Sequence, residues 1–241
     1  ASALIAGQGF ATREVGVMEK FEKIFTRAAK RHGGAKAVEA NLSKPKNAAA
    51  LRKISDDRWL AGMTRAVFQA GFVWKIIENK WPGFEEAFDG FDPHRIAFYT
   101  DEKIGRLASD TRIVRNGQKI MATRDNARFV VELAKEHGSA GTFFAGSKPE
   151  QFAGLLDILK KRGNRLSGAS AQFFLRQMGV DSWILSPSVV AALVNAGVVD
   201  KAPTSRKAME AVQAVFTQWR KESGRSLTEI SRVLAMSADA E

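Results

Sequence analysis

The sequence of 241 residues contains no cysteine, which excludes disulfides, catalytic thiolates and every zinc site that uses a thiolate ligand. It also lacks an apolar run of the roughly 20 residues that a membrane-spanning helix needs. The N-terminal residues show neither the basic stretch nor the apolar core of a signal peptide. These absences predict a cytoplasmic protein without a membrane partner. With 45% hydrophobic and 26% charged residues, the chain has the composition of a globule with a hydrophobic core.

Acidic residues are scarce relative to basic ones. Lys and Arg number 37 and Asp and Glu number 26, which leaves a net charge of +11. The basic residues cluster at 112–128, which contains five basic residues and one acidic residue, and at 160–176, which contains five basic residues and no acidic one. Such clusters attract phosphate backbones, although a solvated surface of mixed charge is the alternative. The clustering favours a phosphate-binding surface.

Convincing alternation of apolar and polar residues, the pattern of strands, is absent, and helical periodicity recurs instead. The pattern predicts an all-α fold. Expected helices cover residues 14–31, 56–80 with an interruption or bend near Gly71, 84–88, 93–99, 101 onward and 119–136. The 56–80 helix is expected to end at Trp81-Pro82-Gly83. Capping boxes are predicted at residues 147–150 and 226–229, each opening a helix.

Residues 159–190 predict two helices joined by a tight turn that contains glycine. Gly168 can adopt positive φ and present successive backbone N–H groups beside the dipole of the next helix, an arrangement that binds phosphate without reading a base. Lys160, Lys161 and Arg162 lie close by in sequence. Phe173 and Phe174 are expected to face inward. The alternative is an ordinary helix-loop-helix in which the glycine only turns the chain.

Five separate motifs resemble those of bacterial 3-methyladenine DNA glycosylase I. They are QAGFVW at 69–74, FDP at 91–93, IVRNGQKI at 113–120, NAR at 126–128 and KKRG at 160–163. The resemblance covers roughly residues 53–190, and LSGAS at 166–170 falls where that superfamily has its helix-hairpin-helix. It implies a two-lobed, all-helical glycosylase bundle that grips DNA through the hairpin and holds a base in a pocket between its lobes.

The resemblance also implies an activity, which is hydrolysis of the N-glycosidic bond of an alkylated purine in double-stranded DNA after base flipping. Trp74 matches the family's pocket tryptophan, whose alternative role is a core residue on a buried helix. The expected base pocket comprises Trp74, Ala66, Gln69 and Phe72. The expected DNA contacts are Arg115, Asn116, Lys119, Lys160, Lys161, Arg162, Ser167, Gly168 and Ser170.

Three departures from the family pattern limit which of the family's properties can be carried over to this sequence. The family's zinc requires cysteines, and Ser186 and Ser188, near its terminal histidine ligand, do not bind zinc. We therefore expect no metal or other cofactor, and packing of the terminal segments 14–31 and 205–235 to replace the zinc. Ala66 stands where the family has a pocket glutamate. Ser186 falls near the position where other superfamily members carry a catalytic aspartate.

No catalytic residue stands out. Glu78, one turn after Trp74, is a weak candidate whose alternative is a surface charge paired with Lys75 or Lys80. Asp181 is a second weak candidate. The enzyme hypothesis therefore competes with a second one, a DNA-lesion-binding protein of this fold that does not cleave or that has a changed substrate.

The expected organisation has three parts. Residues 1–47 form an N-terminal helical extension and linker, residues 48–204 a glycosylase-like domain with the hairpin at 159–180, and residues 205–241 helices that pack on the same globule. We expect a monomer that associates with the nucleoid.

Overall fold

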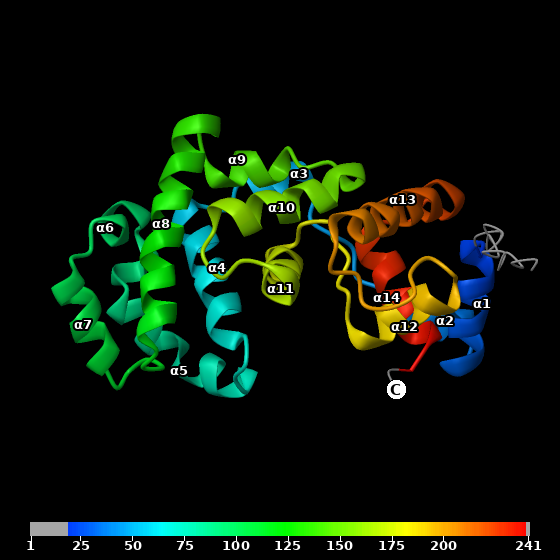
Figure 1. Cartoon of the computed structure of the whole chain (residues 1–241), viewed down its shortest axis with the longest axis horizontal. Coiled ribbons are helices and arrows are strands. Elements are labelled where there is room, and N and C mark those ends of the chain that lie inside the picture. The colour runs from blue at the N-terminus through cyan, green and yellow to red at the C-terminus, as the bar shows by residue number, and fades with distance from the viewer. Residues whose placement is uncertain (1–18, 240–241) are drawn as a thin grey trace, which may run out of the picture.

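The computed structural model describes residues 19–239, and in that range it contains fourteen α-helices, two short 3-10 turns and no strand. The all-α prediction is confirmed. The helices form two lobes (Figure 1). The larger lobe contains α3 (Ala48–Arg52), α4 (Asp56–Gln69), α5 (Trp74–Ala87), η1 (Asp89–Phe91), α6 (Pro93–Ala97), α7 (Asp101–Ser109), α8 (Gly117–His137), α9 (Ala140–Ala145), η2 (Pro149–Gln151), α10 (Phe152–Arg162) and α11 (Gly168–Met178).

The smaller lobe combines the two ends of the described chain. It contains α1 (Phe21–Arg31), α2 (Ala35–Ala40), α12 (Pro187–Asn195), α13 (Arg206–Ser223) and α14 (Leu227–Ser237). α14 packs against α1, α12 and α13. The expected boundary after residue 204 is therefore misplaced, because α12 packs in the smaller lobe. Residues 14–18 of the expected first helix, Val17 included, lie outside the described residues.

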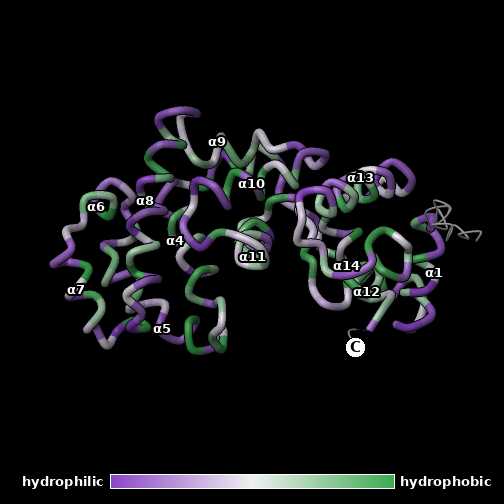
Figure 2. Tube along the Cα trace, viewed as in Figure 1, coloured by the Kyte–Doolittle hydropathy of each residue, from purple (hydrophilic) through white to green (hydrophobic). Residues whose placement is uncertain are grey.

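The larger lobe is built around α4 and α8, which pack against each other, and α8 also contacts α6, α7 and α9. Trp59 of α4 is fully buried and stacks on Phe144 of α9, with ring centroids 4.3 Å apart. Purple and green alternate along most helices in Figure 2, as expected for helices with one buried and one exposed face. Among residues 19–239, no helix combines the length and apolar character required to cross a bilayer.

The expected helical region at 56–80 is interrupted near Gly71 and consists of two helices. α4 ends at Gln69, Ala70 is extended with ψ 118°, and Gly71 has φ +74°, so the backbone turns sharply before α5 begins at Trp74. α5 then continues through Pro82 to Ala87 instead of ending there. The buried ring of Phe84 stacks with Trp81 at 5.3 Å, and this packing outweighs the hydrogen bond that proline removes.

The two predicted capping boxes have different outcomes. The box at Ser226 and Glu229 is present in full and confirms the start of α14. The box at residues 147–150 is absent, because a 3-10 turn fills this position and Glu150 instead pairs with Arg220 of α13. The start of α10 is thus held by the other lobe. Gln213 of α13 also accepts a hydrogen bond from the Ala153 N–H at 2.9 Å.

Two chain segments connect the lobes, and a backbone hydrogen bond joins them. The N–H of Lys46, between α2 and α3, donates to the carbonyl of Gly179, between α11 and α12, at 2.9 Å. Within the smaller lobe the Trp219 indole donates to the Glu19 carbonyl at 2.9 Å. This hydrogen bond ties α13 to the residues just before α1.

Candidate DNA-binding hairpin and aromatic cavity

α10 and α11 form the predicted hairpin, and the turn between them spans Gly163 to Ser167. Gly163 must be a glycine because a Cβ would lie 2.8 Å from the Leu159 carbonyl oxygen and 2.9 Å from Leu166 Cδ1. Gly168 has φ +53°, as the sequence predicts. The Ser167 side chain makes no capping hydrogen bond, so the first-turn N–H groups of α11 remain available to an external acceptor.

A buried side chain of α8 clamps this turn. Asn126 is fully buried, its amide nitrogen donates to the Asn164 carbonyl at 3.0 Å, and its amide oxygen accepts from the Asn164 N–H at 2.7 Å. The Asn164 side chain in turn donates to Asp125 at 2.7 Å. The NAR segment at 126–128 thus positions the hairpin turn, a role that its sequence alone does not reveal.

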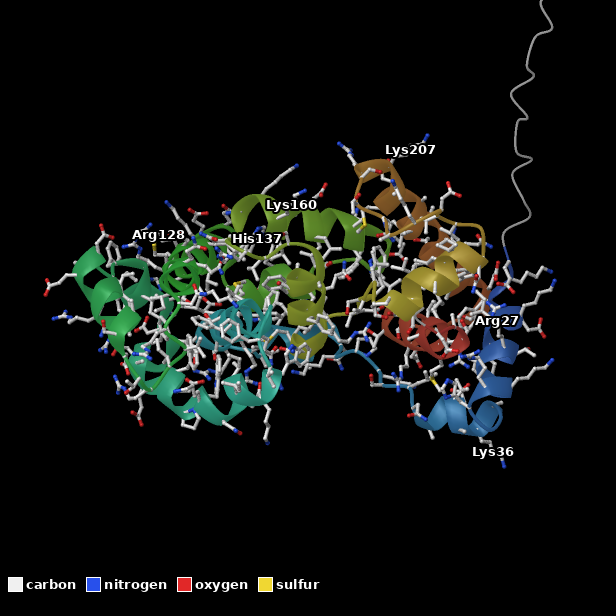
Figure 3. All side chains as sticks on the ribbon, turned by 60° about the horizontal axis from the view of Figure 1, so that its bottom comes forward. Arg27, Lys36, Arg128, His137, Lys160 and Lys207 are labelled. Atoms are coloured by element: carbon white, nitrogen blue, oxygen red, sulfur yellow. The ribbon has the colours of Figure 1, made fainter. Side chains whose placement is uncertain are left out.

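The basic residues of the hairpin have different surroundings. Lys160 and Lys161 are exposed, and Figure 3 places Lys160 at the surface of the larger lobe. Arg162 is instead held by Glu132 at 3.1 Å and Glu136 at 2.7 Å. Those two carboxylates compensate its charge. The guanidinium of Arg162 thereby ties α10 to α8.

The basic residues of the cluster at 112–128 also have different surroundings. Arg115 is exposed, whereas Asn116 caps α8 by accepting from the Lys119 N–H at 3.1 Å. Lys119 is only 7% exposed, and its ammonium donates to the carbonyls of Phe68 at 3.1 Å and Ala70 at 2.6 Å. Burial, assisted by Arg165, lowers the pKa of Lys119. This side chain holds the end of α4 against α8.

A small cavity of about 190 Å³ lies between the α4–α5 connection and the start of α11, and we call it the aromatic cavity. Its lining residues are Ala66, Gln69, Ala70, Gly71, Phe72, Trp74, Ala169, Ser170 and Phe173. The four expected pocket residues are therefore brought together, and Ser170, an expected DNA contact, lies beside them. All of these lining residues belong to the larger lobe.

Two aromatic rings form one wall of the aromatic cavity. Trp74 is 44% exposed, and its ring meets Phe173 edge to face with centroids 5.1 Å apart. Phe173 was expected in the core with Phe174. The two side chains point about 100° apart around α11. Phe174 is buried, and Phe173 is turned toward the cavity.

The candidate carboxylates have structural partners. Glu78 Oε1 accepts from Gln69 Nε2 at 3.0 Å and lies 3.7 Å from Arg65, so the expected alternative pairing with Lys75 or Lys80 is not observed. Glu78 is not among the lining residues of the cavity. Asp181 accepts from the Thr228 N–H at 2.9 Å at the start of α14.

The residues near Ser186 do not fit the zinc site that the resemblance implies. The Ser186 hydroxyl caps α12 by accepting from the Val189 N–H at 3.3 Å. No group of three or more His, Cys, Asp or Glu side chains that could hold a metal gathers within residues 19–239. α1 packs directly against α14.

Comparisons with known proteins agree with this geometry. A crystal structure of a mutant 3-methyladenine DNA glycosylase I from Staphylococcus aureus is 20% identical and covers 74% of this chain and 99% of that chain, with a TM-score of 0.50, which shows a shared fold. A second crystal structure of 3-methyladenine DNA glycosylase I is 24% identical over 61% of this chain and 87% of that chain, with a TM-score of 0.47.

Sequence comparison places the likeness in the larger lobe. DNA-3-methyladenine glycosylase 1 of Escherichia coli (strain K12) is 34% identical over 65 residues, which are 27% of this chain. The match spans about a third of that relative, 35% of its length. The methyladenine glycosylase family model matches residues 50–173. The chain therefore belongs to the methyladenine glycosylase family.

Proposed function

We propose that this protein is a DNA glycosylase that hydrolyses the N-glycosidic bond of an alkylated purine of the 3-methyladenine type in double-stranded DNA. One observation carries the proposal: the N-terminus of α11 lies at the hairpin turn, and the same helix forms one wall of the aromatic cavity. A duplex held by its phosphates at the hairpin would have a flipped base within reach of Trp74.

This reaction requires little general acid or base catalysis from the protein. Alkylation of a ring nitrogen leaves the purine positively charged, so the bond to C1′ breaks with its electron pair passing to the base, which becomes neutral. Water supplies the hydroxyl group at C1′ and releases a proton. The indole of Trp74 stabilises the cationic base through its π face. We assign no acid or base, since no carboxylate lines the aromatic cavity.

The test is release of methylated bases from alkylated duplex DNA, measured by chromatography. We expect release above the spontaneous background without added metal, together with formation of an abasic site. The absence of a cavity carboxylate favours a second candidate, a lesion-binding protein that does not cleave. No release with intact DNA affinity would establish that second function. Action as a monomer, and location at the nucleoid in the cytoplasm, stay predictions.

Substitutions of Lys161 and Lys119 distinguish a residue that contacts phosphate from one that holds two helices together inside the protein. We expect Lys161→Ala to reduce the slope of log Kd against log salt concentration by about 0.9, because one phosphate contact is lost. Lys119→Met should leave that slope unchanged and lower the free energy of unfolding by about 1–3 kcal/mol, because two carbonyls lose a charged donor. Fluorescence anisotropy across a salt series and urea unfolding measure the two effects. An altered slope in Lys119→Met alone would reverse the two assignments.

A further inference from the structure

A cleft of about 450 Å³ lies between the two lobes beside the hairpin, and we call it the interlobe cleft. Residues of α10 and of the first turns of α11 line it from the larger lobe. Residues between 203 and 210, at the start of α13, line it from the smaller lobe. The family model ends at residue 173, so membership of the family does not describe the smaller-lobe side of this cleft.

Direct contacts hold the two sides of the interlobe cleft together. Arg220 of α13 pairs with Glu150. The Gln213 side chain of the same helix accepts from the Ala153 N–H at 2.9 Å and donates to the Pro149 carbonyl at 3.1 Å. α13 is therefore fixed beside α10, and charged side chains on the two lobes keep their positions relative to one another.

A buried amide group on the larger-lobe side faces this cleft. Gln172 of α11 lines the cleft and is only 5% exposed. Its amide oxygen accepts from the Leu185 N–H at 2.7 Å, which leaves the amide nitrogen as the group directed to the cleft. No acceptor within residues 19–239 bonds to that nitrogen. A donor at such a buried position requires an acceptor from water or from a ligand.

The charges that line the interlobe cleft balance one another. Lys160 and Arg206 are its cations, and Asp157 and Glu210 are its carboxylates. Arg206 donates to Glu210 at 2.9 Å, and Glu210 together with Asp157 raises the pKa of Arg206. The carboxylates are thus compensated within the lining, and net attraction for an anion depends on further lysines at the rim.

Such lysines are present on both lobes. Lys161 follows Lys160 on the hairpin, Lys207 follows Arg206 on α13, and all three lysines are exposed. Figure 3 shows Lys160 and Lys207 along the same edge of the molecule, one from each lobe. None of the three forms an ion pair in the described part of the chain. Cations spread over two lobes suit an extended polyanion better than a small anion, and the DNA backbone is such a polyanion.

We propose that duplex DNA lies across the interlobe cleft, so that the smaller lobe is a second DNA-binding element. Lys207 contacts a phosphate next to those held by the hairpin, and Gln172 donates to a backbone oxygen at the cleft. The inference rests on the proposed function in that the hairpin holds the duplex. Phosphate contacts carry no sequence information, so this surface adds affinity for damaged and undamaged DNA alike.

The test removes one cation from either edge of the smaller lobe. Lys207→Ala should weaken binding to undamaged duplex DNA about eightfold at 0.1 M salt and reduce the slope of log Kd against log salt concentration by about 0.9. Lys36 is also exposed, and Figure 3 shows it at the opposite edge of this lobe. Lys36→Ala removes the same charge and should change neither quantity. Fluorescence anisotropy across a salt series measures both variants.

A substitution of Gln172 tests the amide donor. Gln172→Glu keeps an acceptor for the Leu185 N–H but replaces the free donor with a negative charge. We expect at least about tenfold weaker DNA binding, because the carboxylate repels phosphate. Urea unfolding shows whether the variant is folded. If it is not, the exposed Lys207 decides.

The absence of cysteine permits a direct test of proximity. A single thiol introduced by Lys207→Cys can carry an iron–EDTA chelate, which generates hydroxyl radicals with ascorbate and hydrogen peroxide. We expect this chelate to cut the backbone of bound duplex DNA. The same chelate on Lys36→Cys should not cut it.

The outcomes separate the inference from the proposed function. Base release by the wild-type protein, with Lys207→Ala binding DNA no differently from Lys36→Ala, would overturn the inference and keep the glycosylase activity. Absence of base release, with the slope reduced in Lys207→Ala alone, would overturn the activity and support the inference. A wild-type protein that does not bind duplex DNA would overturn both.

Discussion

Replacing Trp74 with alanine is expected to lower the rate of methylated-base release about a hundredfold and to leave the affinity for undamaged duplex DNA unchanged. The side chain is half-exposed and, apart from its edge contact with Phe173, presents its indole to the aromatic cavity. Stacking and cation–π attraction are lost together for a flipped cationic base. We expect undamaged DNA to contact the hairpin and not the cavity. Single-turnover base release and anisotropy binding measure the two effects.

Two further variants make the Trp74 result specific. Trp74→Phe retains an aromatic face and should recover most of the lost rate. Ile76→Ala removes an exposed apolar side chain of the same helix that does not line the cavity, so both release and binding should remain at wild-type values. If Trp74→Ala released bases at the wild-type rate, Trp74 would have only a packing role and the proposed pocket would be wrong.

The second large effect is expected at Asn126. Asn126→Ala should lower the free energy of unfolding by about 2–4 kcal/mol and weaken binding to every DNA sequence, because two hydrogen bonds are lost and the peptide groups of the hairpin turn at Asn164 have no other clamp. The loss of order in the turn should reduce affinity for damaged and undamaged duplex alike. Urea unfolding and anisotropy at fixed salt concentration measure both quantities.

Asn41 provides a matched control for Asn126. Its side chain is exposed and donates to the Ala37 carbonyl at 2.8 Å near the end of α2. Asn41→Ala should change the free energy of unfolding by less than about 0.5 kcal/mol, since water replaces the lost partner. Equal destabilisation by the two substitutions would show that the Asn126 clamp adds nothing beyond an ordinary surface hydrogen bond.

Much of the helical framework was predictable because its signals are local. Helical periodicity and the position of Gly138 located α8 to within a few residues, and the side chains of Ser226 and Glu229 marked the start of α14. Local signals were insufficient where packing opposed them. Pro82 lies within α5 because aromatic stacking holds the helix around it, and the polar pattern at 147–150 is overridden by the pairing of Glu150 with Arg220.

The candidate site was likewise predictable only in part. The sequence identified Trp74, Ala66, Gln69 and Phe72 through motifs, and the fold brings them to one cavity. The sequence alone could not place Phe173 in this cavity, because Phe173 lies on a helix about 100 residues later in the chain. Nor could it distinguish Lys161, which is exposed, from Lys119 and Arg162, whose charges are held by carbonyls and carboxylates of distant segments.

By itself, the sequence determined the helical class of this protein, the position of the hairpin glycines, and the absence of thiolate zinc ligands and of a carboxylate at position 66. Each of these depends on residue identity or on spacing within a few turns of helix. Tertiary structure alone decided which cations face solvent and which rings line the cavity. These properties depend on contacts between segments far apart in the chain, and such contacts leave no periodic pattern in either segment.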